Sequence, residues 1–300
     1  MTERIWFNGR IIPMSEARLS VEDRGFQFAD GVYEVVRLYG GRPFALEEHL
    51  ARLERSAGGI ELPLPLTRPA LLEQIQSFIS VIEAGEGMIY LQLTRGVAPR
   101  NHLFPQNSGY GKIDPTLLFY FRPLPPLPAV DQVSPVKLIA LSDERWQRCW
   151  IKSIALLPNV LAKNAAAAAG ADEAVFVDQG IVTECSASNL FGVIGGKLVT
   201  HPVGAKVLPG ITRAAVLEIA ARLGIVVEER SWTESEALSA EELFILSTTR
   251  EISWVGQWND RMTSTQIGPV TRRVHLALKQ FIAESVRAGS MASRPAIVAA

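Results

Sequence analysis

Two charged side chains lie in strings that are otherwise apolar and strand-like, Lys152 within residues 150–153 and Glu184 within residues 182–191. Burying an ammonium or a carboxylate in such surroundings costs free energy unless the group has a partner. Desolvation also lowers the pKa of a lysine, so that its neutral amine can attack a carbonyl group and form a Schiff base. A carboxylate in such a place can pair with a cationic heterocycle.

Together these two groups supply what a pyridoxal phosphate (PLP) enzyme requires: an amine for the aldehyde and an anion for the ring nitrogen. Taken singly, each residue also has an ordinary explanation. A lysine on a strand usually extends its ammonium to water, and a Thr-Glu pair after a turn is usually part of a surface strand. The rest of the chain has to decide between these interpretations.

Several residues have the pattern of an anion-binding site. Gly210, Ile211 and Thr212 open a well-patterned helix, where free N–H groups and the helix dipole favour a phosphate. Thr212 can equally be an ordinary helix cap. Thr248 follows a predicted strand over 243–247, so its hydroxyl is expected at the end of that strand. Arg52, on an amphipathic helix, either reaches water or grips phosphate.

Arg100 and His102 lie two positions apart in a loop bounded by Pro99 and Pro105. In an extended loop, side chains with this spacing point the same way. A guanidinium and an imidazole that point the same way can clamp a carboxylate, and the prolines stiffen the loop. A surface loop with an incidental basic pair is the competing interpretation.

The composition is that of a globular protein with a sizeable core. The 300 residues are 48% hydrophobic and 20% charged, and the formal net charge of −1 gives no indication of nucleic acid or an anionic membrane as a partner. No apolar run reaches the length of a membrane span, and the N-terminus lacks the features of a signal peptide. Cys149 and Cys185 form no disulfide framework, and no metal-ligand spacing is present. We therefore expect a cytoplasmic protein without a metal.

The hydrophobic pattern predicts two domains that mix helices and strands. We expect an N-terminal α/β domain over residues 1–121, a proline-rich linker over 122–134, a C-terminal domain over 135–287 that carries Lys152, and a flexible tail over 288–300. The predicted strands cover 4–12 (with a turn at 8–9), 32–39, 88–94, 116–121, 136–141, 173–178, 190–194, 197–200, 225–229 and 243–247. The predicted helices cover 47–57, 68–84, 158–169, 212–223 and 265–286.

Five strings of the chain, in the same order, resemble those of the fold-type IV PLP enzymes, the class IV aminotransferase family. The resemblance covers about residues 4–285, and the strings are residues 26–34, 49–53, 151–153, 183–191 and 208–213. It implies an α/β (α+β) fold of two domains with PLP in the cleft between them. It also implies a homodimer in which a loop of the partner helps to close each site.

The resemblance assigns a role to each candidate residue. Lys152 is the PLP lysine and the catalytic base, and Glu184 pairs with the pyridine nitrogen. Arg52, Ile211, Thr212 and Thr248 bind the phosphate. Within the family, residues 94–102 are most similar to bacterial D-amino acid aminotransferases, in which an Arg-x-His pair, here Arg100 and His102, binds the substrate carboxylate together with Tyr33. Tyr90 also fits that pattern.

The expected reaction is transamination between a D-amino acid and a 2-oxo acid, with 2-oxoglutarate as the expected acceptor. A branched-chain L-amino acid aminotransferase is the main alternative on the same fold, followed by an aminodeoxychorismate lyase and an (R)-amine transaminase. A non-catalytic PLP-binding homologue is the alternative from another class. The chain departs from the family pattern at Cys185 and Ala187, where glycine and serine are usual.

Overall fold

The computed structural model describes residues 3–288, and the chain divides into two compact units. The first unit comprises the chain up to Pro126 together with Ile151–Ala155. The second comprises Leu127–Trp150 and Leu156–Arg287. Within residues 3–288, none of the helices combines the length and the apolarity that crossing a membrane requires.

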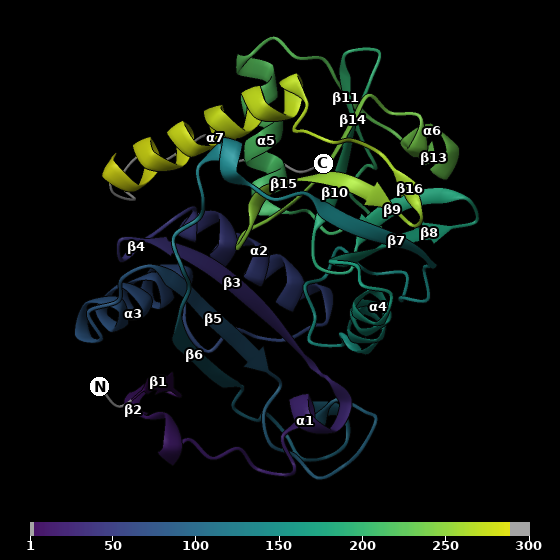
Figure 1. Ribbon diagram of the computed structural model, residues 1–300. Coiled ribbons are helices and arrows are strands. Elements are labelled where there is room, and N and C mark those ends of the chain that lie inside the picture. Colours follow the sequence, from purple (N-terminus) through teal and green to yellow (C-terminus); the bar gives the residue numbers. More distant parts are fainter. Residues whose placement is uncertain (1–2, 289–300) are drawn as a thin grey trace. The chain divides into compact units, whose positions relative to one another are not determined.

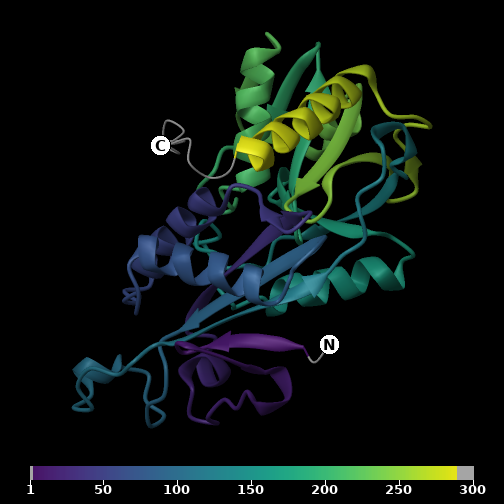
Figure 2. The same ribbon diagram turned by 90° about the vertical axis from the view of Figure 1, so that its left-hand side faces the viewer.

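The first unit is built on an antiparallel sheet in the order β2-β1-β6-β5-β3-β4 (Figure 1). Its strands are β1 (Arg4–Phe7), β2 (Arg10–Pro13), β3 (Gly31–Tyr39), β4 (Arg42–Pro43), β5 (Gly87–Thr94) and β6 (Thr116–Pro123). Its helices are α1 (Arg24–Phe28), α2 (Leu46–Gly59) and α3 (Arg68–Val81), with short 3-10 turns η1 (Met14–Glu16) and η2 (Pro105–Asn107). Helices α2 and α3 lie side by side, as Figure 2 shows.

Strand β3 presents a different face of the sheet at each successive residue, because side chains alternate along a strand. Val32, Val36 and Leu38 pack in one core with Leu50 and Leu53 of α2. Each fully buried aliphatic side chain of this kind contributes about 1.5–3 kcal/mol to folding. The core between this sheet and α2 therefore fixes the position of β3.

The second unit contains a mixed sheet in the order β12-β11-β10-β14-β15-β7-β8-β9-β13, with β16 paired to β15. Its strands are β7 (Val136–Ser142), β8 (Glu173–Asp178), β9 (Ile181–Cys185), β10 (Asn189–Ile194), β11 (Lys197–Thr200), β12 (Val227–Glu229), β13 (Trp232–Thr233), β14 (Glu242–Ser247), β15 (Glu251–Trp258) and β16 (Arg261–Met262). Strand β7 runs parallel to β8 and β15, and β11 runs parallel to β12, whereas the other pairs are antiparallel.

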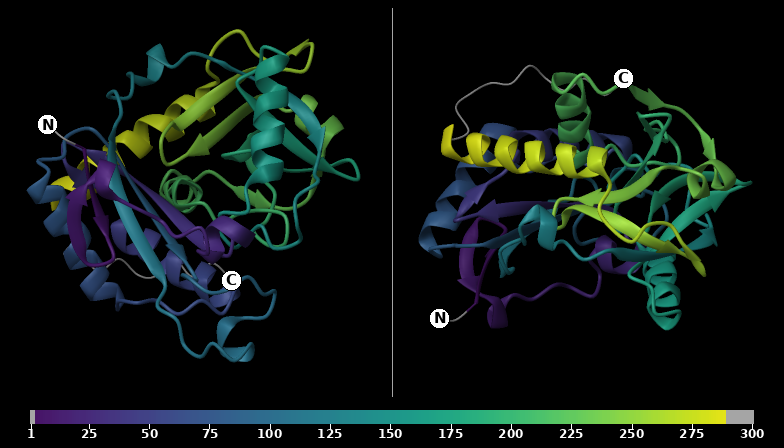
Figure 3. Two further views of the ribbon diagram at one scale, coloured as in Figure 1. Left: turned by 90° about the horizontal axis from the view of Figure 1, so that it is seen from below. Right: turned by 45° about the horizontal axis from the view of Figure 1, so that its top comes forward.

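The helices of the second unit are α4 (Leu157–Ala168), α5 (Ile211–Arg222), α6 (Glu234–Leu238) and α7 (Pro269–Ala288), and η3 (Val130–Gln132) is a 3-10 turn. Ala162 and Ala166 of α4 pack on Phe176 of β8. Helices α5 and α7 contact each other through Arg222, whose guanidinium lies over the Phe281 ring. The right-hand view of Figure 3 shows the two helices, α5 in green and α7 in yellow.

Most of the predicted strands and helices are confirmed, with small shifts at their ends. Helix α3 ends at Val81 instead of residue 84, and α7 begins at Pro269 instead of residue 265. Strand β6 continues to Pro123, inside the segment predicted as a linker. A proline is tolerated there because β1 pairs only with residues 118–120, so that side of β6 is an edge at Pro123. The short α1 and α6 and the long β15 were not predicted. The predicted tail beyond residue 288 lies outside the described residues.

The segment that holds Lys152 clusters with the first unit, whereas the sequence placed it in the C-terminal domain. The reason is backbone pairing: Ser153 forms a bridge with Val32, and the N–H of Ile154 donates to the carbonyl of Gly31 over 3.1 Å. The domain limits themselves, and a cofactor cleft between two domains, stay predictions.

A comparison of two glycines with positive φ separates two ways in which an added side chain lowers stability, namely crowding against neighbouring atoms and backbone strain. Gly96 has a φ of +93° and Gly109 a φ of +86°, but a Cβ at Gly96 would overlap the carbonyl oxygen of Asp114, whereas a Cβ at Gly109 meets open space. We expect Gly109→Ala to cost about 1 kcal/mol through backbone strain alone. Gly96→Ala should cost about 2 kcal/mol more, because the backbone has to move. Urea unfolding of both variants checks this, and equal midpoints would contradict it.

Candidate active site

Lys152 lies beside the start of β3, and its chain segment fixes the direction of its side chain. The N–H of Tyr33 donates to the carbonyl oxygen of Lys152 over 3.0 Å, and the N–H of Lys152 donates to Ser56 Oγ over 3.0 Å. Ile151 is buried in the core under α2, and the half-buried Lys152 places its Nζ 4.3 Å from the centre of the Tyr33 ring. The expected strand around Lys152 is reduced to one bridge, at Ser153.

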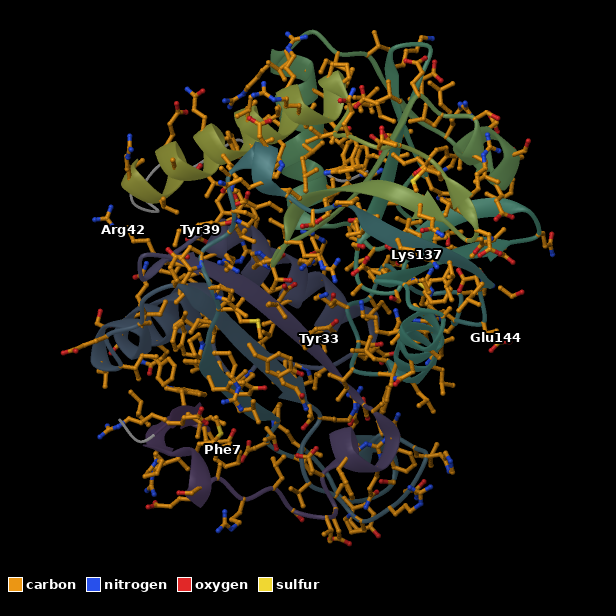
Figure 4. All side chains as sticks on the ribbon, in the orientation of Figure 1. Phe7, Tyr33, Tyr39, Arg42, Lys137 and Glu144 are labelled. Atoms are coloured by element: carbon orange, nitrogen blue, oxygen red, sulfur yellow. The ribbon has the colours of Figure 1, made fainter. Side chains whose placement is uncertain are left out.

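Tyr33 begins a row of phenol rings across the first sheet. Its ring centre lies 5.8 Å from that of Tyr90, which in turn lies 5.2 Å from that of Tyr120. Figure 4 labels Tyr33 on β3. Burial, followed by the neighbouring phenols, raises the pKa of Tyr90 well above its ordinary value, and its hydroxyl donates to Gln92 Oε1 over 2.8 Å. The Lys152 amine therefore lies against the first ring of this aromatic row.

Arg52 is buried and ion-paired. Only 3% of its surface is exposed, and its Nε and Nη2 each donate to the carboxylate of Glu34 over 2.7 Å. This bidentate geometry is the strongest form of a carboxylate–guanidinium contact. The interpretation of Arg52 as a solvent-exposed surface cation is therefore wrong.

Glu34 is a site residue that sequence reasoning missed, although it lies within one of the five family strings. His49 Nδ1 lies 2.7 Å from Glu34 Oε2. Burial would raise the pKa of Glu34, but the charge and hydrogen bonds of Arg52, aided by His49, hold that pKa well below its usual value. Burial lowers the pKa of His49, so we assign a neutral ring that donates from Nδ1. The signal in the sequence was a lone carboxylate on an apolar strand.

Arg100 and His102 are both exposed and both contact the ring of Phe28 in α1. The guanidinium of Arg100 lies 4.4 Å from the centre of that ring, and the imidazole of His102 lies 5.3 Å from it. The prediction that these two side chains point the same way is consistent with this shared platform. Lys152 and Tyr33 form a separate group of contacts in the same unit.

In the second unit, β9 holds Glu184 with 5% of its surface exposed. Its Oε1 accepts from Arg145 Nη1 over 2.5 Å, and its Oε2 accepts from Asn189 Nδ2 and from the N–H of Leu208, each over 3.0 Å. Hydrogen bonds of this kind favour the charged form of a buried carboxylate. The expectation of a surface strand is wrong for Glu184.

Arg145 is a second residue that the sequence did not reveal. It donates from Nε and Nη2 to the two carboxylate oxygens of Asp143, each over 2.9 Å, as well as to Glu184. Burial would lower the pKa of Arg145, but Asp143 and Glu184 raise it above its ordinary value. In the sequence, Arg145 lies in a polar stretch that is typical of a surface loop, so no pattern marked it.

A helix begins beside Gly210, as the sequence predicted. Gly210 is the N-cap of α5 and provides no side-chain cap, while Ile211 and Thr212 are buried in the first turn. Thr212 is therefore not the cap. A Cβ at Gly210 would overlap the side-chain oxygen of Asn189, so a glycine is required where Asn189 joins this turn to Glu184.

Thr248 lies in the turn that follows β14, as the sequence predicted. Strand β14 is hydrogen-bonded to β10, with Leu246 opposite Asn189. Thr248 therefore lies two residues beyond the partner of Asn189. Asn189 lies next to three parts of the second unit. It donates to Glu184, its side chain lies against Gly210 at the start of α5, and it pairs with Leu246 just before the Thr248 turn.

The buried pair of Glu34 and Arg52 can be tested against an exposed pair that also includes a residue of α2. Glu34→Gln leaves the buried guanidinium of Arg52 without its anion, so we expect the free energy of unfolding to fall by about 3–5 kcal/mol. Glu54 forms an exposed ion pair with Arg68, and Glu54→Gln should cost about 0.5 kcal/mol or less. Equal urea midpoints for the two variants would show that burial does not determine how much stability an ion pair contributes.

A comparison with known proteins bears on this arrangement. The family model described as amino-transferase class IV matches residues 31–258. A D-alanine aminotransferase of Bacillus licheniformis is 40% identical to this chain over 280 residues, which cover 93% of this chain and 97% of the relative. A D-alanine aminotransferase of Listeria innocua is 38% identical over 287 residues, covering 95% and 97% of the two chains.

Solved structures show the same fold. The branched-chain amino acid aminotransferase of Escherichia coli superposes with a TM-score of 0.85 at 26% identity, covering 94% of this chain and 95% of the other. The branched-chain aminotransferase of the archaeon Thermoproteus uzoniensis, solved with norvaline, gives a TM-score of 0.80 at 25% identity, covering 95% and 96% of the two chains. The expected fold-type IV class is confirmed. With matches of this length on both sequence and fold, the chain belongs to the class IV aminotransferases.

Proposed function

We propose that this chain is a PLP-dependent aminotransferase that exchanges the amino group of a D-amino acid with a 2-oxo acid, with 2-oxoglutarate as the expected acceptor. The single observation that carries the proposal is the Lys152 amine, half-buried and 4.3 Å from the centre of the Tyr33 ring. The D-alanine aminotransferases at 38–40% identity support D-amino acids as substrates more strongly than the branched-chain enzyme at 26% supports L-amino acids.

The residues present fit PLP. The chain offers an amine at Lys152, a buried carboxylate at Glu184 held by three donors, and a helix at Ile211 whose first turn has no side-chain cap. These match an aldehyde, a ring nitrogen and a phosphate respectively. When bound, PLP supplies an electron-withdrawing ring that accepts the electron pair released at the substrate Cα.

Lys152 has two roles in this proposal. Its amine would hold the cofactor, and the freed Nζ would take the proton from the substrate Cα and deliver it to the cofactor carbon C4′. The Tyr33 ring, whose centre lies 4.3 Å from Nζ, forms an aromatic wall beside this amine and orients it. Tyr90, with its raised pKa, keeps its proton throughout.

Glu184 holds the ring nitrogen in its protonated form. Arg145 and the other donors to Glu184 keep that carboxylate ionised, so that it can face a cation instead of taking its proton. In this proposal Arg52, the N–H groups of Ile211 and Thr212, and Thr248 would each contribute to binding the phosphate. The free N–H groups of a helix start favour a dianion of this kind.

Arg100 and His102 bind the α-carboxylate of the substrate, with Tyr33 as a third donor. The position of the carboxylate decides which face of the cofactor the α-hydrogen of the substrate would meet. It therefore selects the enantiomer. The exposed Arg100–His102 loop is consistent with the homodimer that the family resemblance implies, in which a loop of one subunit helps to close the site of the other. We place the enzyme in the cytoplasm, in keeping with its two free thiols.

Replacement of Lys152 tests the covalent role. We expect Lys152→Ala to lose the visible absorption of bound PLP and at least about a hundredfold in turnover, because both the attachment point and the base are removed. Lys197→Ala is the matched control, since Lys197 forms an exposed ion pair with Glu228. Sodium borohydride should fix PLP to the Lys152 peptide of the parent chain. Retained turnover in Lys152→Ala would reject the assignment.

Replacement of Arg100 tests the substrate class. With 2-oxoglutarate as acceptor, the parent chain should consume D-alanine in preference to L-alanine and L-leucine. Arg100→Ala should raise KM for D-alanine roughly a hundredfold, because a charged hydrogen-bond partner of the carboxylate is lost. The absorption of bound PLP should stay the same. Preference for L-leucine, with an unchanged KM in the variant, would favour the branched-chain alternative.

A further inference from the structure

The ring of Phe28 contacts three cationic or donor side chains at once. The guanidinium of Arg24 lies 4.8 Å from the ring centre, that of Arg100 lies 4.4 Å from it, and the imidazole of His102 lies 5.3 Å from it. The electron-rich face of an aromatic ring attracts a guanidinium and orients it. Phe28 is thus a common platform for both proposed carboxylate-binding residues.

Behind this platform, Arg24 fastens the loop that carries the pair. Arg24 is only 3% exposed, and its Nη1 donates to the carbonyl of Asn101 over 2.6 Å and to that of Leu103 over 3.4 Å. These two carbonyls belong to the residues on either side of His102. Because Arg24 Nε also donates to Asp30 Oδ2 over 2.8 Å, the guanidinium is held in place and fixes the loop in turn.

Arg95 holds the far end of the same loop. Its Nε donates to Asp30 Oδ2 over 2.8 Å, and its guanidinium lies 3.8 Å from the ring centre of Phe104. It also donates to the carbonyls of Ile60 and Glu61. Asp30 therefore receives two buried guanidinium groups, and the loop over 96–104 is fixed at its start and at its end.

Such anchoring has a physical purpose at an exposed site. A free arginine side chain has many rotamers, and its ordering on binding reduces affinity by the lost entropy. Arg100 and His102 are exposed, and contact with water alone does not restrict an exposed side chain to one rotamer. A ring beneath both side chains, on a loop with buried anchors, reduces that entropy before any substrate arrives.

We propose that Phe28 is a positioning residue that, together with Arg24, holds Arg100 and His102 as a preformed pair for the substrate carboxylate. The inference rests on the proposed function, because it takes Arg100 and His102 as the carboxylate-binding pair. Phe28 acts only through these two side chains. Its effect should therefore appear with substrates that carry an α-carboxylate and vanish with amines that lack one.

Phe28→Leu tests this, because leucine keeps an apolar side chain but removes the aromatic face. We expect KM for D-alanine and for 2-oxoglutarate to rise about tenfold, as for the loss of one cation–π platform. Turnover at saturation and the absorption of bound PLP should change less than about twofold. The rate of the half-reaction with D-alaninol, which has no carboxylate, should be the same as in the parent chain. Phe28→Tyr should restore KM.

Phe281→Leu is the matched control, since the Phe281 ring also lies beneath an arginine, Arg222, at 5.1 Å, but in the second unit. Its KM values should equal those of the parent chain. If Phe28→Leu fails to fold, as thermal melting reveals, Phe28→Met takes its place with the same expected result. An unchanged KM in a folded variant, or an equal loss with D-alaninol, overturns the proposal.

A double variant separates this inference from the proposed function. If Phe28 acts through Arg100, adding Phe28→Leu to Arg100→Ala should raise KM by less than about twofold more, because coupled residues are not additive. A full further tenfold loss contradicts the positioning role. If Arg100→Ala alone leaves KM unchanged, the carboxylate assignment fails. If Arg100→Ala raises KM and Phe28→Leu does not, only the role of Phe28 fails.

Discussion

The backbone pairing of residues 151–155 with the start of β3 is the constraint on which the candidate site depends. The Tyr33 N–H to Lys152 carbonyl bond and the Ser153 bridge set the register of this segment. With that register, Ile151 enters the core under α2 and Lys152 emerges beside Tyr33. A slip of one residue would reverse the two side chains, because neighbours on an extended chain face opposite ways. The Lys152 amine is thus placed mainly by main-chain hydrogen bonds, together with the bond from the Lys152 N–H to Ser56 Oγ.

Glu34 and Glu184 are both buried, so the charge of each carboxylate has to be stabilised by protein groups instead of water. Glu34 has Arg52 and His49 as partners, and Glu184 has Arg145, Asn189 and a backbone N–H. Buried ion pairs add little net stability, because desolvation offsets most of the attraction. Their effect is to fix charge and direction at one place. A fixed charge suits the role that we propose for each residue, phosphate binding for Arg52 and pairing with a ring nitrogen for Glu184.

Sequence reasoning located residues that lie in recognisable strings, but it did not find their partners. Lys152, Glu184 and the Gly210 turn could be found because each interrupts or opens a clear pattern. Arg145 could not, since its partner Glu184 lies on a strand far along the chain and only folding brings the two together. Helix α1 was missed for a different reason: its five residues are too few for a hydrophobic period. Yet this short helix supplies Phe28, the platform beneath Arg100 and His102.

The contacts of Cys185 and Ala187 explain why the chain can depart from the family pattern at these two positions. Ala187 donates through its backbone N–H to Glu173 Oε1 over 2.6 Å, and the hydroxyl of Ser188 donates to the same oxygen over 2.9 Å. A side chain at position 187 is not needed for that contact, so alanine keeps the turn in place. Cys185 is buried in the apolar core of the second unit, and burial raises its thiol pKa well above the ordinary value. It therefore acts as a small neutral core residue, and the donors to Glu184 beside it come from Arg145, Asn189 and Leu208.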